Sequence, residues 1–310
     1  RYLNGTLDDL YDPMLLKDME RAVSILCEAV DTGKKIRIVG DYDIDGVCST
    51  YILLQAFERL GSDVDFEIPD RIKDGYGINE SIIEQAHADG VEVILTCDNG
   101  ISAFHQVELA KKYGMTVVIT DHHEVPLDGE KEKIPPADAV IDPKQADCPY
   151  PFPEICGAVV AYKLVQVLYA RRGVLQMEWL DLLEFAAIAT VGDVMKLQDE
   201  NRILVKYGLK KMAQTKNLGL RRLAEKNNLD LGAITAYHIG FVIGPCLNAG
   251  GRLKTAKEAL ALLRAQSEEE AERLAEELKE LNDTRKDMTE QGTEAAKLQV
   301  ESWYQKDRKS

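Results

Sequence analysis

The sequence lacks several features that would place it in a common protein class. Hydrophobic residues make up 45% of the chain, yet they form no unbroken run of the length, about 18 residues, that a membrane-spanning helix needs. There is also no C-x-x-C pair, no zinc-finger spacing, no Walker A motif, no G-x-S-x-G and no H-E-x-x-H. We therefore expect no membrane association and none of the chemistries that these motifs carry.

Basic residues are scarce relative to acidic ones. The chain has 38 Lys and Arg against 53 Asp and Glu, which gives a formal charge of −15. Non-specific DNA affinity comes from neutralising phosphates, so this balance argues against a protein that coats DNA. It leaves open a local basic groove, or carboxylates gathered around cations.

Six cysteines are scattered along the chain, which begins at Arg1 with neither an initiator Met nor a secretory hydrophobic segment. Scattered cysteines without metal-binding spacing are typical of free thiols in a reducing compartment. We therefore expect buried free thiols, a cytoplasmic location and a chain that is part of a longer protein.

Strand and helix patterns alternate in the first half. Val- and Ile-rich runs predict strands at residues 35–39, 63–68, 92–96, 115–120 and 139–141, and helical spacing predicts helices at 47–60, 81–88 and 102–113. Continuous apolar strands separated by helices are typical of a parallel sheet with helices on both faces. The sequence therefore predicts an α/β domain over residues 1–155.

Strand patterns stop near Cys156. The remainder predicts helices at 158–170, 179–190, 200–213, 218–225 and 256–263, followed by one long charged helix at 268–303. A long helix with charges all round is typical of a solvated connector between domains. The Pro-rich stretch 125–136 predicts a surface loop.

Acidic residues and histidines follow three of the predicted strands, those at 35–39, 92–96 and 115–120. They are Asp41, Asp43 and Asp45 after the first, Asp98 after the next, and Asp121, His122 and His123 after the third. Because the carboxyl ends of parallel strands share one edge of a sheet, these side chains are expected to converge. Asp142 follows a further predicted strand near the same edge.

Converging carboxylates repel one another unless cations lie between them. Mainly oxygen ligands with one or two imidazoles favour Mn²⁺ or Mg²⁺, and several carboxylates can neutralise about two divalent ions. Each motif has a simpler alternative, because a D-x-D after a strand is often a helix cap and Asp98-Asn99-Gly100 alone is a typical turn. The coincidence of three such clusters favours a two-metal site.

Four motifs resemble those of the DHH phosphoesterase superfamily. They are DYDIDG at 41–46, DNG at 98–100, DHH at 121–123 and ATVGDV at 189–194. The runs DGYG at 74–77 and LNAGGRL at 247–253 are similar to the RecJ branch of single-strand-specific exonucleases. The resemblance implies a parallel-sheet DHH domain, a helical part at 156–254 carrying the fourth motif, and a connector at 255–310 leading to a second, DHHA1-type domain.

The resemblance also implies roles for individual residues. The metal ligands would be Asp41, Asp43, Asp45, Asp98, His122 and Asp193. Asp98 would bridge two ions, while Asp41 is either a ligand or an acceptor that orients other groups. Asp121 would orient a neighbouring histidine, and His123 would face the substrate phosphate; with Asp98 these are the catalytic candidates. Asn248 and Arg252 are candidates for phosphate contact, although Arg252 is equally consistent with a helix cap or a salt bridge.

The implied activity is 5′-to-3′ hydrolysis of single-stranded DNA by a hydroxide activated by two Mn²⁺ or Mg²⁺ ions, in repair and recombination. The implied partners are single-stranded DNA and other repair proteins. Two alternatives stay open: a phosphodiesterase or phosphatase acting on short oligonucleotides, cyclic dinucleotides or polyphosphate, and a non-catalytic replication scaffold. The family's Gly-Gly-His-type motif and OB domain do not occur before Ser310. We therefore expect a catalytic fragment that binds DNA weakly.

Overall fold

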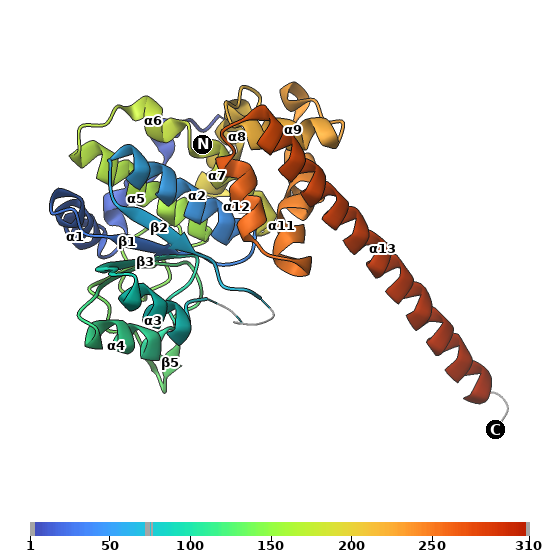
Figure 1. The fold of residues 1–310 in the computed structure, drawn as a ribbon, viewed down its shortest axis with the longest axis horizontal. Helices are drawn as coiled ribbons and strands as arrows, with labels where there is room; N and C mark the ends of the chain where they lie inside the picture. The colour runs from blue at the N-terminus through green and yellow to red at the C-terminus, as the bar shows by residue number, and fades with distance from the viewer. Residues whose placement is uncertain (1–3, 72–74, 76, 308–310) are drawn as a thin grey trace.

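The computed structural model describes residues 4–71, 75 and 77–307, and their side chains as far as residue 300. Its centre is a parallel five-stranded sheet of order β2-β1-β3-β4-β7 (Figure 1). The strands are β1 (Ile36–Val39), β2 (Val64–Glu67), β3 (Val93–Cys97), β4 (Thr116–Thr120) and β7 (Ala139–Ile141). The predicted fold class, a parallel sheet flanked by helices, is confirmed.

Helices cover both faces of this sheet and create two apolar cores. On one face pack α1 (Met19–Asp31), α2 (Ile44–Arg59) and α5 (Gly157–Arg171); on the other pack α3 (Glu80–Ala88) and α4 (Phe104–Lys112) (Figure 1). Successive strand residues alternate between the cores, so Ile38 belongs to the first and Val39 to the second. Burial on both faces explains why β1, β3 and β7 read as largely apolar runs.

The strand order creates a crevice at the carboxyl ends of β1 and β3. β1 pairs with β2 on one side and β3 on the other. The connection that leaves β1 runs through α2 on one face to β2, and the connection that leaves β3 runs through α4 on the opposite face to β4. Neighbouring strands whose connections leave in opposite directions open a crevice at their carboxyl ends, where ligands bind in sheets of this kind.

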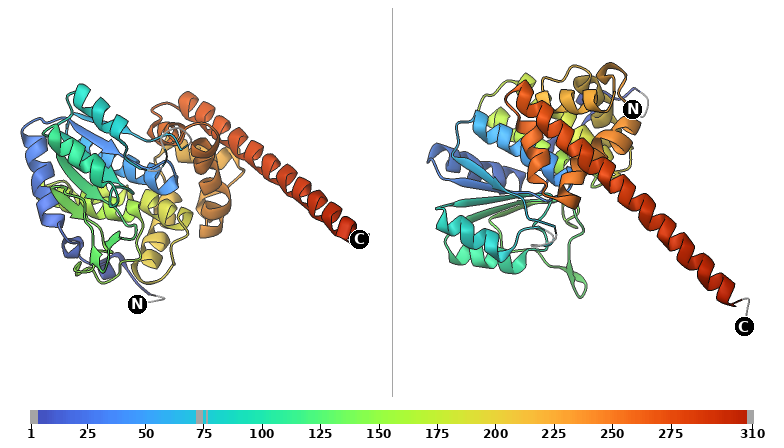
Figure 2. Two further views of the ribbon diagram at one scale, coloured as in Figure 1. Left: turned by 90° about the horizontal axis from the view of Figure 1, so that it is seen from below. Right: turned by 45° about the vertical axis from the view of Figure 1, so that its right-hand side comes forward.

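The second half of the described chain is helical. Its elements are α6 (Gln176–Leu180), α7 (Leu183–Gly192), α8 (Asp199–Met212), α9 (Leu218–Lys226), a 3-10 turn η3 (Leu231–Ala233), α10 (Ala236–His238), a π-helical segment η4 (Ile239–Ile243), α11 (Gly244–Leu253), α12 (Lys257–Arg264) and α13 (Glu268–Asp307). The beginning of α13 packs on α9, α11 and α12. Residues 286–300 are exposed and project away from the body, as Figure 2 shows from two sides.

Two predicted elements need correction. The helix predicted over 179–190 is two helices, α6 and α7, which separate at Asp181 and Leu182. At this break the Asp181 carboxylate accepts hydrogen bonds from Lys211 and Lys216, which lie about thirty residues further along the chain. The predicted surface loop 125–136 contains a short hairpin, β5 (Leu127–Asp128) and β6 (Lys131–Glu132). Gly129, with φ of 65°, makes its turn.

No described helix combines the length and apolar character that crossing a bilayer requires. All six cysteines are free, and they are buried except Cys148, which is partly exposed. In the predicted DGYG loop, Asp74 and Tyr76 lie outside the described residues.

Candidate metal centre

Carboxylate and imidazole side chains from separate segments meet at the carboxyl edge of the sheet. They form three overlapping groups: Asp98 with His122 and His123, Asp45 with His122 and Asp193, and Asp41 with Asp43 and Asp98. Within each group, one potential ligand atom of every residue lies within 4.8 Å of the others. The structure therefore brings together residues that follow β1, β3 and β4, together with Asp193 from the end of α7.

The segment after β1 forms the first turn of α2 and fixes two of these acids. Asp43 caps α2, because its Oδ1 accepts from the backbone N–H groups of Asp45 at 2.9 Å and Gly46 at 3.1 Å. Asp45 accepts from the N–H groups of Gly157 and Ala158, each at 2.7 Å, where α5 begins. The helix-cap interpretation of this motif therefore holds for Asp43 in addition to its place in the cluster. Helices α2 and α5 therefore both direct the positive end of their dipole at the site.

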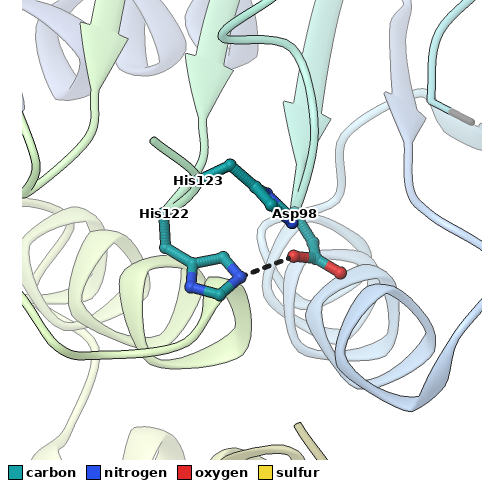
Figure 3. A group of neighbouring side chains, drawn as sticks. All are labelled: Asp98, His122 and His123. Atoms are coloured by element: carbon teal, nitrogen blue, oxygen red, sulfur yellow. Dashed lines mark ion pairs between the residues drawn. The ribbon is translucent and has the colours of Figure 1, made fainter. Parts of the chain in front are cut away.

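Asp98 and His122 form the centre of the cluster. Asp98 follows β3 with a left-handed backbone, φ 60°, and its Oδ1 lies 3.1 Å from Nε2 of His122 (Figure 3). The same Nε2 lies 3.4 Å from Oδ2 of Asp45 and 3.8 Å from Oδ2 of Asp193. Burial lowers the pKa of His122. The imidazole is therefore neutral near pH 7, which is the form that binds metal ions.

Burial and mutual repulsion raise the pKa values of the carboxyl groups. Burial and the charge of Asp43 raise the pKa of Asp41 to about 7, and burial and Asp45 raise the pKa of Asp193 to about 7. For Asp98, burial and its neighbours Asp45 and Asp43 raise the pKa well above its ordinary value. In the described part of the chain, Oδ1 of Asp41 is buried without a hydrogen-bond partner. Oxygen donors of this density, with a neutral imidazole, fit a divalent cation such as Mn²⁺ or Mg²⁺.

Asp121 lies behind His123 and fixes its ring. Its Oδ1 is 2.7 Å from Nδ1 of His123, and it also accepts from the backbone N–H of His122 at 2.8 Å, while Oδ2 accepts from that of Ile101 at 2.9 Å. Burial alone would raise the pKa of Asp121, but these donors hold it below its ordinary value. Burial alone would lower the pKa of His123, but Asp121 raises it to about 9. The His123 side chain is 43% exposed, so substrate can reach it.

The two residues predicted to contact phosphate both lie on α11. Asn248 uses Oδ1 to accept from the backbone N–H of Ile44 at 2.7 Å, so it supports the first turn of α2. Arg252 is exposed and lines, with Tyr42 and Asp43, a hollow of about 260 Å³ beside the cluster. Among the described residues it has no ion-pair or side-chain hydrogen-bond partner. The helix-cap and salt-bridge alternatives for Arg252 are therefore not seen in this part of the chain.

Two residues that shape the site were given no role by the sequence patterns. A Cβ atom on Gly157 would lie 2.7 Å from Cβ of Asp98, so only glycine lets α5 begin this close to the cluster. Asn99 is buried, and its Nδ2 donates to the carbonyls of Val39 and Cys97, which ties the end of β1 to the end of β3. Asn99 belongs to a recognised motif, but nothing in the sequence distinguishes Gly157 from other helix-starting glycines.

The family assignment rests on the match of residues 35–190 to the DHH family, N-terminal domain. The chain belongs to the DHH family. Its similarity within the DHH family is to RecJ. The single-stranded-DNA-specific exonuclease RecJ of Bacillus subtilis (strain 168) is 41% identical over 293 residues, which are 94% of this chain and 36% of the relative. RecJ of Escherichia coli (strain K12) is 38% identical over 294 residues, 91% of this chain and 50% of the relative.

Solved structures give the same assignment. A crystal structure of exonuclease RecJ bound to manganese superposes with a TM-score of 0.80 at 35% identity, covering 89% of this chain and 68% of that one. RecJ from Thermus thermophilus in complex with Mn²⁺ gives 0.76 at 34% identity, covering 89% and 39%. The resemblance to the RecJ branch, drawn from the sequence motifs, is confirmed. The chain spans about a third to a half of the length of the curated relatives described above.

Proposed function

We propose that this chain carries the metal-binding catalytic part of a RecJ-type exonuclease, which hydrolyses single-stranded DNA from the 5′ end in repair and recombination. The observation that carries the proposal is the set of three overlapping acid and histidine groups at the β1–β3 crevice. Relatives named as single-stranded-DNA-specific exonucleases, and RecJ structures that contain Mn²⁺, support it. The 5′-to-3′ direction rests on the likeness to RecJ alone. A DNA substrate also favours a cytoplasmic location.

The residues that would hold two divalent cations are Asp41, Asp43, Asp45, Asp98, His122 and Asp193. When bound, such cations make water a stronger nucleophile near neutral pH and neutralise charge on the phosphate under attack. The hydrogen bonds that Asp43 and Asp45 accept from helix N–H groups hold these carboxylates in place before any cation arrives. Such preorganisation is what a tight metal site requires.

Protein groups around the cluster would position the phosphodiester. Asp121 occupies Nδ1 of His123, which leaves Nε2 as the ring nitrogen that can hydrogen-bond a phosphate oxygen or the leaving oxygen. Arg252 offers its guanidinium at the hollow beside Asp43, and a guanidinium fork suits phosphate. Both groups are positively charged or donate hydrogen bonds, so they stabilise the negative charge of the substrate.

Replacing Asp98 by alanine tests the proposal. Because Asp98 belongs to two of the three groups, we expect Asp98→Ala to lower the release of nucleotides from a 5′-phosphorylated single strand in Mn²⁺ by at least about hundredfold. Circular dichroism should show an unchanged fold. Asp128→Ala, which removes an exposed acid from β5, should keep wild-type activity.

Retained turnover in Asp98→Ala would remove the metal-dependent mechanism. Faster cleavage of a dinucleotide or a cyclic dinucleotide than of the long strand would instead favour the short-oligonucleotide phosphodiesterase, which shares this site. Hydrolysis of none of these substrates by the wild-type chain, together with no Mn²⁺ binding, would favour the scaffold alternative.

A further inference from the structure

A groove leads away from the metal centre along α11. The hollow of about 260 Å³ that contains Asp43 adjoins a second one of about 200 Å³. The two share Gly192, Asn248 and Arg252 as wall residues, and Gly240 and Arg285 line the second one alone. The groove therefore runs from the acids that follow β1 to the π-helical segment η4 and the connector helix α13.

Of the arginines that line this groove, Arg252 and Arg285 are not neutralised by carboxylates of the described residues. Arg252 has no ion-pair partner among the described residues, and Arg285 donates to the amide oxygen of Asn282, at 3.3 Å from Nε and 3.1 Å from Nη2, rather than to an acid. In a chain with a formal charge of −15, the second hollow has a local positive character, because both arginines and no acid of the described residues line it. Positive grooves of this kind follow the backbone of single-stranded nucleic acids.

Two exposed aromatic rings lie on the short segment that carries Gly240, a wall residue of the second hollow. Tyr237 is 65% exposed and Phe241 67% exposed, and their ring centroids are 4.7 Å apart with planes inclined by 28°. Gly240, which lines the second hollow, lies between them in the sequence. Exposure of a large aromatic ring to water is unfavourable, so covering the ring lowers the free energy. A nucleobase covers such a ring by stacking, irrespective of its identity.

We propose that Tyr237 and Phe241 form a stacking platform for bases of a single strand whose phosphates lie in the groove at Arg252 and Arg285. This inference rests on the proposed function, because it names the surface that holds the strand beyond the phosphodiester at the metal centre. Stacking without base-edge contacts gives binding that depends on the presence of bases and not on their sequence.

The test measures binding separately from cleavage. In an Asp98→Asn background with Mn²⁺, fluorescence anisotropy gives the dissociation constant for a thymidine 12-mer. We expect the added pair Tyr237→Ala and Phe241→Ala to raise this constant by about tenfold or more, because a stacked base contributes at least that much. On a 12-mer of abasic sugars and phosphates, parent and variant should bind equally. Tyr237→Phe, which keeps a ring, should bind the thymidine strand like the parent.

Tyr113→Ala is the matched control. Tyr113 is also an exposed ring in a stacked pair, 4.2 Å from His87, but it precedes β4 and so lies at the opposite edge of the sheet from the metal centre. Its removal should leave binding unchanged. An unchanged dissociation constant in the double alanine variant would overturn the platform, as would an equal loss on the abasic strand.

The outcomes also separate this inference from the proposed function. If the wild-type chain cleaves the strand while the double variant binds it like the parent, the platform is wrong and the nuclease proposal stands. If base-dependent binding is lost in the variant while the wild-type chain cleaves nothing, the platform stands and the nuclease proposal fails.

Discussion

Asp45 shows how a single side chain serves both the fold and the site. Its two oxygens accept the first N–H groups of α5, while Oδ2 also faces Nε2 of His122. A carboxylate oxygen has more than one lone pair, so a backbone donor does not exhaust its capacity to bind a cation. Asp45 is therefore held by the fold rather than by the cations it would bind.

Gly157 allows the closest approach between a helix and the cluster. We predict that Gly157→Ala, whose Cβ would lie 2.7 Å from Cβ of Asp98, displaces one of the two and costs about 1–3 kcal/mol of unfolding free energy. It should also weaken Mn²⁺ binding. Gly292→Ala is the control: nothing lies within 4 Å of its new methyl group, and alanine favours helix by up to about 1 kcal/mol. Equal stability of Gly157→Ala and wild type, measured by urea unfolding, would refute the packing argument.

The buried Glu184 should make the stability of the fold depend on pH, and this effect does not involve the metal centre. Burial raises its pKa from 4.5 to about 7 in the folded chain, where Oε1 accepts from Oγ1 of Thr215 at 2.7 Å. Between these two pKa values the folded state keeps a proton that the unfolded state has released, so the unfolding free energy falls as pH rises. The contribution of Glu184 to the unfolding free energy is complete below pH 4.5 and is lost above about pH 7.

The difference between wild type and Glu184→Gln isolates this effect, because glutamine does not titrate. We expect wild type to lose about 3 kcal/mol relative to the variant between about pH 4 and about pH 8, measured by urea unfolding at each pH. A difference that stays constant across this range would show that Glu184 is not buried as an acid.

Much of the site was predictable because its acids follow strands directly. Asp98 and Asp121 each come immediately after a buried run, and sheet geometry alone brings such positions together. The close approach of Gly157 to Asp98 and the bond from Asn248 to Ile44 were not predictable, because they join segments far apart in the sequence. Local pattern carries no information about which distant segment packs on a given turn.

At the scale of elements, the strands and most helices follow from local pattern. The strand predicted at 139–141 is Ala139–Ile141, and the helix predicted at 218–225 is Leu218–Lys226. Helix α1 and the stretch from α10 to α11 were not predicted. In that stretch Gly240, Gly244 and Pro245 disfavour a regular helix, and the chain accommodates them with a π-helical segment and with Pro245 near the start of α11.

Helix α13 divides into a packed and an exposed part, which two leucines distinguish. Leu278 is fully buried against the body, whereas Leu298 is 65% exposed on the projecting part. We predict that Leu278→Ala lowers the unfolding free energy by about 2–5 kcal/mol and that Leu298→Ala changes it by less than about 0.5 kcal/mol. Urea unfolding measures both. A similar cost at the two positions would mean that the projecting part is packed in solution.

At the scale of the whole molecule, charge is distributed to suit a cation-dependent site. The formal charge is −15, and at one sheet edge the buried Asp41 and Asp98 and the partly buried Asp193 have raised pKa values. Such an arrangement destabilises the folded chain unless cations bind there. Ligands that bind only the folded state raise its stability as their concentration exceeds the dissociation constant. Metal binding and folding are therefore expected to be coupled in this protein.

Calorimetric titration with Mn²⁺ is the sharpest test of the two-metal site. We predict that the wild-type chain binds two Mn²⁺ ions and that Asp98→Ala, which removes a residue from two of the three ligand groups, binds fewer. A wild-type chain that binds no Mn²⁺, or an Asp98→Ala chain that binds it as wild type does, would contradict the existence of this site.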